Sequence, residues 1–328
     1  MTKIIFVGGT GRCGTSIVKD VIAEHPDVAS LPFEYRFIID PDGLVDFYTS
    51  SAAAWSPYLA DRRLKRLERL LNHLAREPLH HRVLGFLLRQ WNRDGKVLSP
   101  RIYHGWELVR HLPNFERHTR DLMSKLVDFS FPACWVGTES YQFFPQVYHA
   151  APRPKEELAQ ILGDFIRSVI DDLIRQTGKT LFVEDNTWNI LFAREILELL
   201  PEAKIIHIYR DPRDVVASFS QQRWSPADKE QGAWWYRAMM VHWFNMRSAL
   251  PAGSFYELKL EDLVASPEAM LRDICRFAEV PFDGMMLHTD LSHSHSGRWK
   301  QEYDDYEKIA VHRILGDIIE ELGYDIAS

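Results

Sequence analysis

The chain has 328 residues, of which 46% are hydrophobic and 26% are charged, a composition typical of a folded globular protein with room for one large α/β domain. A net charge of −7 argues against non-specific binding to nucleic acid, and no apolar run approaches the length needed to span a bilayer. Three cysteines without CxxC spacing, together with no visible signal peptide, predict a reducing, cytoplasmic location without a disulfide framework or a zinc site.

The first predicted elements are a strand over residues 3–8 and a helix over residues 14–24. From about residue 40 to residue 152 the pattern changes. Helical stretches at 61–76 and 114–129 alternate there with loops rich in Trp, His and Pro, and strand signals are few. We interpret this part as a mostly helical insertion within a single domain of residues 1–328.

The second half of the chain alternates helices and strands. Apolar spacing predicts a helix over residues 155–177. The remaining predicted elements are strands at 180–184, 204–209 and 254–258, helices at 189–200, 212–222, 234–250 and 267–278, a loop at 292–302 and a last helix at 306–322. This alternation predicts a central parallel sheet with helices on both faces, in which ligands bind at the carboxyl ends of the strands.

A glycine-rich loop follows the first strand and reads Gly9-Thr10-Gly11-Arg12-Cys13-Gly14-Thr15-Ser16. It fits the dinucleotide pattern GxGxxG, with Glu34 twenty residues beyond, but the segment before Glu34 has little strand character. It also fits the Walker spacing of nucleotide kinases, except that Thr15 stands where the lysine is required. A phosphatase would use Cys13 as its nucleophile and would need an arginine where this chain has Lys19.

The remaining interpretation is a loop that wraps one terminal phosphate. Arg12 would project toward the group attached to that phosphate, and Thr15 and Ser16 would donate hydroxyl hydrogen bonds from the first helical turn. A second strand-to-helix junction carries Arg210 and, eight residues later, Ser218. A ligand with two separated phosphates would satisfy both junctions.

Together and in this order, the two junctions resemble the sulfotransferases that use 3′-phosphoadenosine 5′-phosphosulfate (PAPS). The family's 5′-phosphosulfate loop is similar to residues 12–16, and its 3′-phosphate motif is similar to residues 208–218. Residues 255–267 look like the family's later strand and helix start, and residues 297–300 look like the late loop over the nucleotide. The chain departs from the family at residues 184–188, where many members carry Lys-Thr-Pro. The resemblance covers residues 3–36 and about 180–300.

The resemblance implies a P-loop-like fold and a donor, PAPS, that leaves as adenosine 3′,5′-bisphosphate (PAP), with no metal needed. It implies catalytic roles for Arg12 and for Glu34, the latter as base. It implies that the donor is bound by the following residues: Gly11, Arg12, Cys13, Gly14, Thr15, Ser16, Arg210, Ser218, Gly297, Arg298 and Trp299. The acceptor would be a hydroxyl, or an amine, of a small molecule, glycolipid or saccharide, and a homodimer is compatible with the sequence.

Several alternatives stay open. Glu34 could instead form an ion pair with Arg36 or Arg12, and three histidines could replace it as base: His104, His111 and His242. Asn186 or Thr187 could bind the nucleotide, and Trp188 could either line a pocket or pack in the core. Tryptophans of the insertion (Trp55, Trp91, Trp106 and Trp135) could stack on an acceptor, whereas Trp224, Trp234, Trp235 and Trp243 suggest a core or a partner-helix face. The competing functions are a P-loop-type nucleotide kinase and an inactive nucleotide-binding relative.

Overall fold

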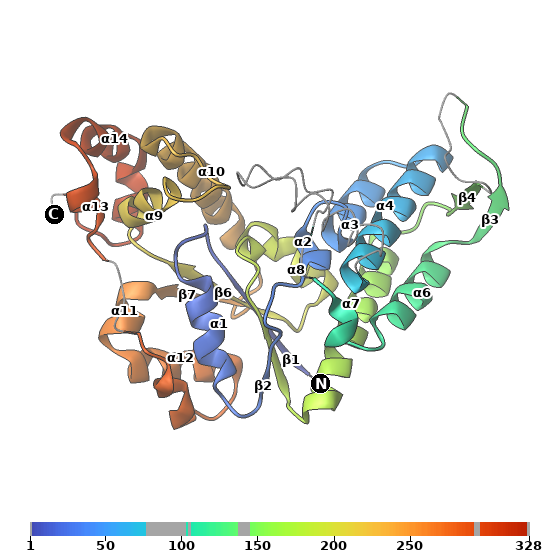
Figure 1. The fold of residues 1–328 in the computed structure, drawn as a ribbon, viewed down its shortest axis with the longest axis horizontal. Helices are drawn as coiled ribbons and strands as arrows, with labels where there is room; N and C mark the ends of the chain where they lie inside the picture. The colour runs from blue at the N-terminus through green and yellow to red at the C-terminus, as the bar shows by residue number, and fades with distance from the viewer. Residues whose placement is uncertain (1, 77–102, 104–105, 137–144, 292–295, 327–328) are drawn as a thin grey trace, which may run out of the picture. The chain divides into compact units, whose positions relative to one another are not determined.

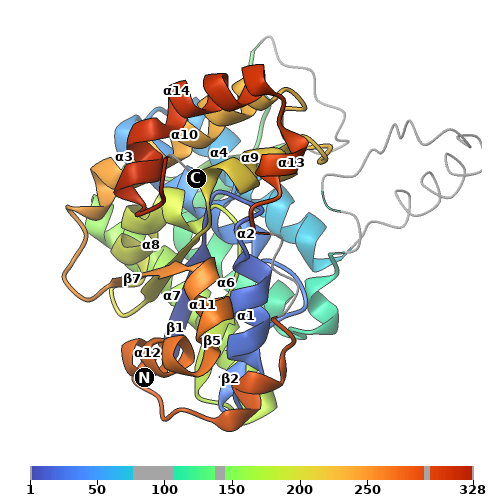
Figure 2. The same cartoon turned by 90° about the vertical axis from the view of Figure 1, so that its left-hand side faces the viewer.

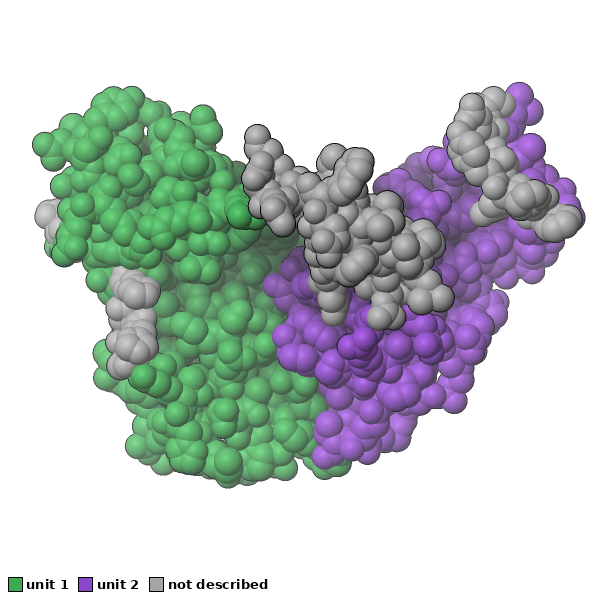
Figure 3. Space-filling view, viewed as in Figure 1, with its two compact units in different colours: residues 1–30, 178–328 green, residues 31–177 purple. Residues whose placement is uncertain are grey.

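The computed structural model describes residues 2–76, 103, 106–136, 145–291 and 296–326 (Figures 1 and 2). The chain divides into two compact units (Figure 3). Unit 1 comprises Met1–Ser30 and Gly178–Ser328, and unit 2 comprises Leu31–Thr177. The prediction of one domain with an insertion at about 40–152 stays a prediction. Within the described part of the chain, no helix is both long and apolar enough to cross a membrane.

A five-stranded sheet forms the centre of unit 1, with the strand order β2-β5-β1-β6-β7. Every pair of neighbouring strands is parallel. The strands are β1 (Lys3–Gly8), β2 (Val28–Ala29), β5 (Leu181–Glu184), β6 (Lys204–Tyr209) and β7 (Phe255–Lys259). The middle strands are nearly continuous buried apolar runs, as expected for a parallel sheet covered on both faces. The predicted α/β fold with a central parallel sheet is therefore confirmed.

Helices flank this sheet. In both views α1, α11 and α12 lie together beside it, whereas α9, α10, α13 and α14 pack on one another beyond its carboxyl end (Figures 1 and 2). The helices of unit 1 are α1 (Thr15–Ala23), η2 (Asn189–Phe192), α8 (Ala193–Leu199), α9 (Pro212–Phe219), α10 (Lys229–Arg247), α11 (Leu260–Ala265), α12 (Pro267–Ala278), η3 (Gly284–His288), α13 (Trp299–Glu302) and α14 (Asp305–Glu321).

Unit 2 is built mainly from helices that share an apolar core. Leucines at three- and four-residue spacing on α4 form one side of this core. The elements are α2 (Arg36–Ile39), α3 (Leu44–Ala53), α4 (Pro57–Ala75), η1 (Leu108–Arg110), α6 (Phe115–Leu126) and α7 (Lys155–Thr177), with an antiparallel pair, β3 (Phe129–Pro132) and β4 (Gln146–His149).

Several predicted boundaries were wrong. The helix expected over 114–129 ends at Leu126, because the β-prone segment that follows enters β3. Helix α10 begins five residues before the predicted Trp234, since the Asp228 carboxylate accepts a hydrogen bond from the Gln231 amide and caps the helix there. The loop expected at 292–302 contains α13, although residues 292–295 of that loop lie outside the described residues.

Candidate functional site

The loop between β1 and α1 is forced into an unusual backbone path. Gly11, Arg12 and Gly14 have φ angles of 86°, 57° and 105°, so three of four consecutive residues lie in the left-handed region. For Arg12 this conformation costs about 1 kcal/mol, a strain that is typical of functional loops. Arg12 itself is an exposed residue of the loop.

Cys13 lies beneath this loop. A Cβ atom on Gly9 would lie only 2.2 Å from the Cys13 sulfur, so the glycine is required for the loop to close over the thiol. Burial raises the pKa of the Cys13 thiol. A phosphatase nucleophile needs the opposite shift, and the buried, protonated thiol therefore acts as packing under the loop.

The dinucleotide interpretation does not fit the sheet. In a dinucleotide-binding fold the strand after the first helix pairs directly with the first strand. Here β5 lies between β1 and β2, and β2 ends at Ala29, five residues before Glu34. The acidic residue expected at the end of that second strand is consequently not there.

Helix α1 begins without a side-chain cap. Gly14 occupies the N-cap position and has no side chain to accept the first N–H groups of the helix. Thr15, Ser16 and Ile17 of the first turn instead line a cavity. The positive end of the helix dipole thus faces open space, which favours an anion at this position.

The second junction supplies its positive charge from a side chain. Asp211 accepts a hydrogen bond from the Arg213 amide and Asp214 lies in the first turn, so the N-terminus of α9 already carries two carboxylates of the protein. The N-terminus of α9 is therefore not an open anion site. Arg210 provides the charge, with its Nη2 atom 3.4 Å from the Asp214 carboxylate. Ser218 follows in the last turn of the same helix.

The two junctions meet in space. Arg12 Nε donates a hydrogen bond of 2.9 Å to the Ser218 hydroxyl, although 206 residues separate them. Arg12 and Arg210 line the same cavity of about 310 Å³. The lining residues are Arg12, Gly14, Thr15, Ser16, Ile17, Thr187, Arg210, Trp224, Leu260, Val264, Asp290 and Leu291. Since β5, β1, β6 and β7 each end just before one of these residues, the cavity lies at the carboxyl edge of the sheet.

Asp214 connects Arg210 to the predicted late loop. Its fully buried carboxylate accepts hydrogen bonds from the backbone N–H groups of Gly297, at 2.7 Å, and Trp299, at 3.1 Å. Arg298, expected as a third cation, instead forms an ion pair of 2.6 Å with Glu302. Residues 297–299 are not among the described lining residues of the cavity, so this loop is connected to the site through Asp214 and Arg210.

Trp299 is covered by an arginine. The guanidinium carbon of Arg213 lies 4.2 Å from the centre of the indole ring, and the Tyr303 hydroxyl donates to the Arg213 carbonyl oxygen. Trp299 is almost fully buried. Its ring is therefore a packing element of α9 and α13 in this structure, rather than an open stacking surface.

Residues 184–188, where many family members carry Lys-Thr-Pro, include residues that stabilise the turn after β5 and one residue that lines the cavity. Glu184 accepts hydrogen bonds from the Asn186 amide and the Asn189 side chain, which ties the end of β5 to the following turn. Thr187 accepts a 2.7 Å hydrogen bond from the Gly9 amide through its carbonyl oxygen and lines the cavity. Trp188 is not among the described lining residues, so of the three alternatives Thr187 is the one at the site.

Glu34 belongs to unit 2. Its carboxylate forms an ion pair with Arg36, which also contacts Asp40, and its carbonyl oxygen accepts a hydrogen bond from the Trp106 indole at 3.1 Å. The ion pair that the sequence left open is thus formed with Arg36. The role of Glu34 as base stays a prediction.

The alternative bases have other surroundings. His242 Nε2 lies 3.0 Å from the Leu191 carbonyl oxygen, and the His111 ring packs edge-on against Phe33. His104 lies outside the described residues, as does Trp91. Trp55, Trp106 and Trp135 are described, and all three lie in unit 2.

Trp224 is a site residue that the sequence did not reveal. The indole lines the cavity, and its Cη2 atom would lie 2.8 Å from a Cβ on Gly11, so the ring covers the glycine of the first loop. Its ring packs on Phe219 and Trp235 at centroid distances of 5.9 Å. Helical spacing suggested a core residue. Trp224 lies in the segment between α9 and α10. A position between two helices was the one feature of the sequence that could have distinguished it from a core residue.

Comparison with known proteins finds a matching family model and similar solved structures. The model of the Sulfotransferase family matches residues 65–284, a span that includes Arg210 and Ser218 and begins after Arg12. The sulfotransferase domain from the curacin biosynthetic pathway superposes with a TM-score of 0.52 at 14% identity, covering 99% of each chain. A sulfotransferase from Alicyclobacillus acidocaldarius has a TM-score of 0.44 at 13% identity, covering 100% of this chain and 98% of the other.

A curated relative is also similar. An uncharacterized protein of Aquifex aeolicus (strain VF5) is 32% identical over 103 residues. The match covers 28% of this chain and only 13% of that relative.

Proposed function

The chain belongs to the sulfotransferase family, and from this premise we propose that it transfers a sulfuryl group from PAPS to a hydroxyl or amine of a small-molecule, glycolipid or saccharide acceptor. PAP would be the second product. The observation that carries the proposal is the hydrogen bond between Arg12 and Ser218, because it brings the two phosphate-type motifs to one cavity. The three unpaired cysteines of the structure are compatible with a cytoplasmic location.

The cavity suits a ligand with two anionic groups. Arg12 and Arg210 supply two permanent positive charges, and the uncapped start of α1 supplies N–H donors. Within the described part of the chain, Arg12 uses one of its five N–H donors on Ser218, which leaves the others for a ligand. In this assignment Arg12, Gly14, Thr15 and Ser16 hold the 5′-phosphosulfate. Arg210 and Ser218 hold the 3′-phosphate.

The chemistry is an in-line displacement at sulfur. The acceptor oxygen forms a bond to sulfur while the bond from sulfur to the bridging phosphate oxygen breaks, and the departing PAP carries the negative charge. Arg12 would stabilise that charge, and Glu34 would take the proton of the acceptor. As in phosphoryl transfer, most of the rate enhancement would come from positioning and charge stabilisation.

Ligand-induced thermal stabilisation tests the donor assignment. The purified protein is heated alone and with PAP, ADP or NAD, each at about one hundred times the dissociation constant of PAP. A selective binder gains about 2.7 kcal/mol of stability under these conditions. We expect PAP to raise the melting temperature and ADP and NAD to have little effect. Stabilisation by ADP equal to that by PAP would favour the kinase alternative, and no response to PAP would refute the proposal.

Activity with a labelled donor tests the reaction itself. We expect transfer of the labelled sulfuryl group from PAPS to a hydroxyl acceptor without added metal. Binding of PAP with no transfer to any member of a broad acceptor panel would support the inactive relative instead.

A further inference from the structure

One end of unit 2 exposes several large aromatic side chains. Trp55, Tyr58, Phe129 and Phe131 are between 40% and 55% exposed, and Trp135 is half-buried beside them. We call these five residues the aromatic end. Every residue of β3 is exposed, which is unusual for a strand that carries two phenylalanines. Exposed apolar surfaces of this kind mark contact sites rather than ordinary protein surface.

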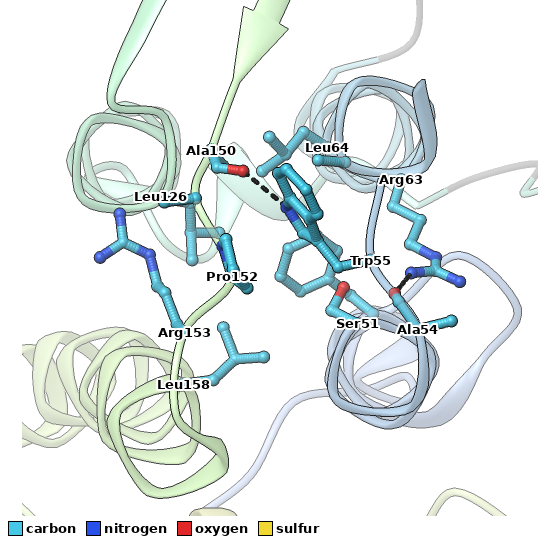
Figure 4. Close-up of a pocket in the computed structure, with 13 residues that line it drawn as sticks. Ser51, Ala54, Trp55, Arg63, Leu64, Leu126, Ala150, Pro152, Arg153 and Leu158 are labelled. Atoms are coloured by element: carbon cyan, nitrogen blue, oxygen red, sulfur yellow. Dashed lines mark hydrogen bonds between the residues drawn. The ribbon is translucent and has the colours of Figure 1, made fainter. Parts of the chain in front are cut away.

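Contacts link these residues into one surface. Phe129 lies 6.2 Å from Phe131 and stacks on His149 of β4 at 4.5 Å. Ala150, the residue after His149, accepts a 2.9 Å hydrogen bond from the Trp55 indole (Figure 4).

On the other side of the aromatic end, Tyr58 packs edge-on against Trp135 at 5.0 Å. The aromatic end is therefore assembled from the start of α4, from β3 and from the segment that follows β3. Its rings are held in place by these contacts.

The strands beneath the rings are anchored to α4. Asp61 accepts hydrogen bonds from the Tyr148 amide, at 2.8 Å, and from the Trp135 indole, at 2.9 Å. Lys65 donates to the Gln146 carbonyl oxygen. Because β4 is bonded to α4 in this way and β3 pairs with β4, the backbone that carries Phe129 and Phe131 is fixed to the helix.

A line of arginines runs along α4 from the same end. Arg62, Arg66 and Arg69 follow at helical spacing and are exposed. We call them the arginine stripe. With five basic residues and two carboxylates, this 19-residue helix carries a net charge of +3 in a chain whose net charge is −7. The Arg62 guanidinium lies 6.0 Å from the Tyr58 ring, which joins the stripe to the aromatic end.

The stripe retains positive charge that the protein does not neutralise. Arg66 forms an ion pair with Asp42. In the described part of the chain, Arg62 and Arg69 have no carboxylate partner. The nearby carboxylate of Asp61 is buried and bonded to β4 and Trp135, and Asp128 is paired with Arg153 at 2.7 Å.

The aromatic end is a surface and not a ligand pocket. The cavity beside Trp55 measures about 40 Å³, space for a few water molecules, and is lined mainly by apolar residues (Figure 4). Ligand pockets for small molecules are several times larger. A partner must therefore bind across the exposed rings of this surface rather than inside a pocket.

We propose that the aromatic end and the arginine stripe dock unit 2 on an anionic lipid bilayer. Tryptophan and tyrosine rings favour the interface between headgroups and acyl chains, and exposed arginines are attracted to anionic headgroups. A second copy of the chain is the less favourable occupant. Two-fold pairing of this surface would bring two helices of charge +3 together.

Co-sedimentation with vesicles tests this docking. The full-length protein is mixed with vesicles of phosphatidylcholine alone or of phosphatidylcholine with phosphatidylglycerol. We expect binding to the anionic vesicles that weakens as salt is raised, and little binding to the neutral ones. The double variant Arg62→Gln/Arg69→Gln should partition about 30-fold more weakly, from two lost arginine charges. Phe129→Ser/Phe131→Ser should bind weakly at any salt concentration.

Matched variants on unit 1 control for general changes in charge and polarity. Arg272→Gln/Arg276→Gln removes two exposed arginines of α12, and Tyr306→Ser/Ile309→Ser removes two exposed apolar side chains of α14. Both should bind vesicles like the wild type. Equal losses in these controls, or no binding of the wild type to anionic vesicles, would overturn the proposal. If the wild type does not bind vesicles but forms a dimer in analytical ultracentrifugation, and Phe129→Ser/Phe131→Ser dissociates that dimer, the surface binds a second copy of the chain and the proposal is refuted.

Discussion

Ser218 offers the sharpest test of how the two junctions cooperate. Its hydroxyl accepts the Arg12 hydrogen bond at 2.9 Å, and a serine hydroxyl can accept one bond while donating its own proton to another group. In the proposed complex that proton goes to the 3′-phosphate. Ser218→Ala removes the donor without removing any carbon atom, so the packing of α9 is retained.

The expected loss follows from the charge of the acceptor. A hydrogen bond to a charged group contributes about 1.5–3 kcal/mol, which corresponds to roughly 10- to 150-fold in the dissociation constant. We therefore expect Ser218→Ala to weaken PAP by this factor. Adenosine 5′-monophosphate lacks the 3′-phosphate, and its affinity should change little. Because Arg12 is exposed and can bond to water instead, the free energy of unfolding should fall by only about 1 kcal/mol.

Isothermal titration calorimetry with the two nucleotides measures this difference directly. Ser220→Ala is a matched control, since the Ser220 hydroxyl bonds to the Ala217 carbonyl oxygen and not to Arg12. An equal loss of affinity for both nucleotides in Ser218→Ala would mean a general disturbance of the loop. Unchanged PAP affinity would refute the assignment of Ser218 to the 3′-phosphate.

Four further outcomes are expected. Glu34→Gln should reduce turnover by roughly 10²–10⁴ with donor affinity retained, and near-normal turnover would reject this residue as the base. Gly9→Ala should lower the free energy of unfolding by about 1–3 kcal/mol in denaturant titrations, because its Cβ would overlap a sulfur atom at 2.2 Å, whereas Gly284→Ala, with no atom within 4 Å, should be neutral. Burial alone would raise the pKa of Glu257, but hydrogen bonds and positive charge around the carboxylate lower it from 4.5 to about 2. Its stabilising contribution, on the order of 3 kcal/mol, is complete above pH 4.5 and is lost as the pH falls toward 2, a loss that Glu257→Gln should remove from acid-unfolding curves. Asp214→Ala should lower stability by about 3–5 kcal/mol and weaken PAP, since it removes a fully buried carboxylate that lies 3.4 Å from Arg210 and accepts two backbone hydrogen bonds. Wild-type PAP affinity at a temperature where the variant is folded would argue against its role in positioning.

The strongly periodic elements could be predicted from the sequence. The helices at Lys155–Thr177 and Pro267–Ala278 and the strand at Lys204–Tyr209 have the predicted bounds. The two-residue strand Val28–Ala29 could not be predicted, because its pairing with β5 depends on residues far along the chain. The same holds for β3, whose partner β4 was not recognised as a strand.

The site shows the same division. The positive charges of Arg12 and Arg210 follow from local motifs, and the cavity contains both. Whether a side chain caps the N-terminus of each helix does not follow from such motifs. Asp211 caps α9 through its side chain, whereas α1 has a glycine at that position. Trp224 reaches the cavity because of how the segment after α9 packs on Phe219 and Trp235, which local spacing does not encode.

The central position of β1 has a consequence for synthesis of the chain. The two strands that pair with β1 are β5 and β6, and they begin only at Leu181 and Lys204. During translation β1 is therefore synthesised long before either of its partner strands. Residues 31–177 emerge completely in the interval. We therefore expect the nascent chain to fold unit 2 first and to form the cavity at the carboxyl edge of the sheet late. Until then β1 is an exposed apolar strand, which favours binding of a chaperone at this stage.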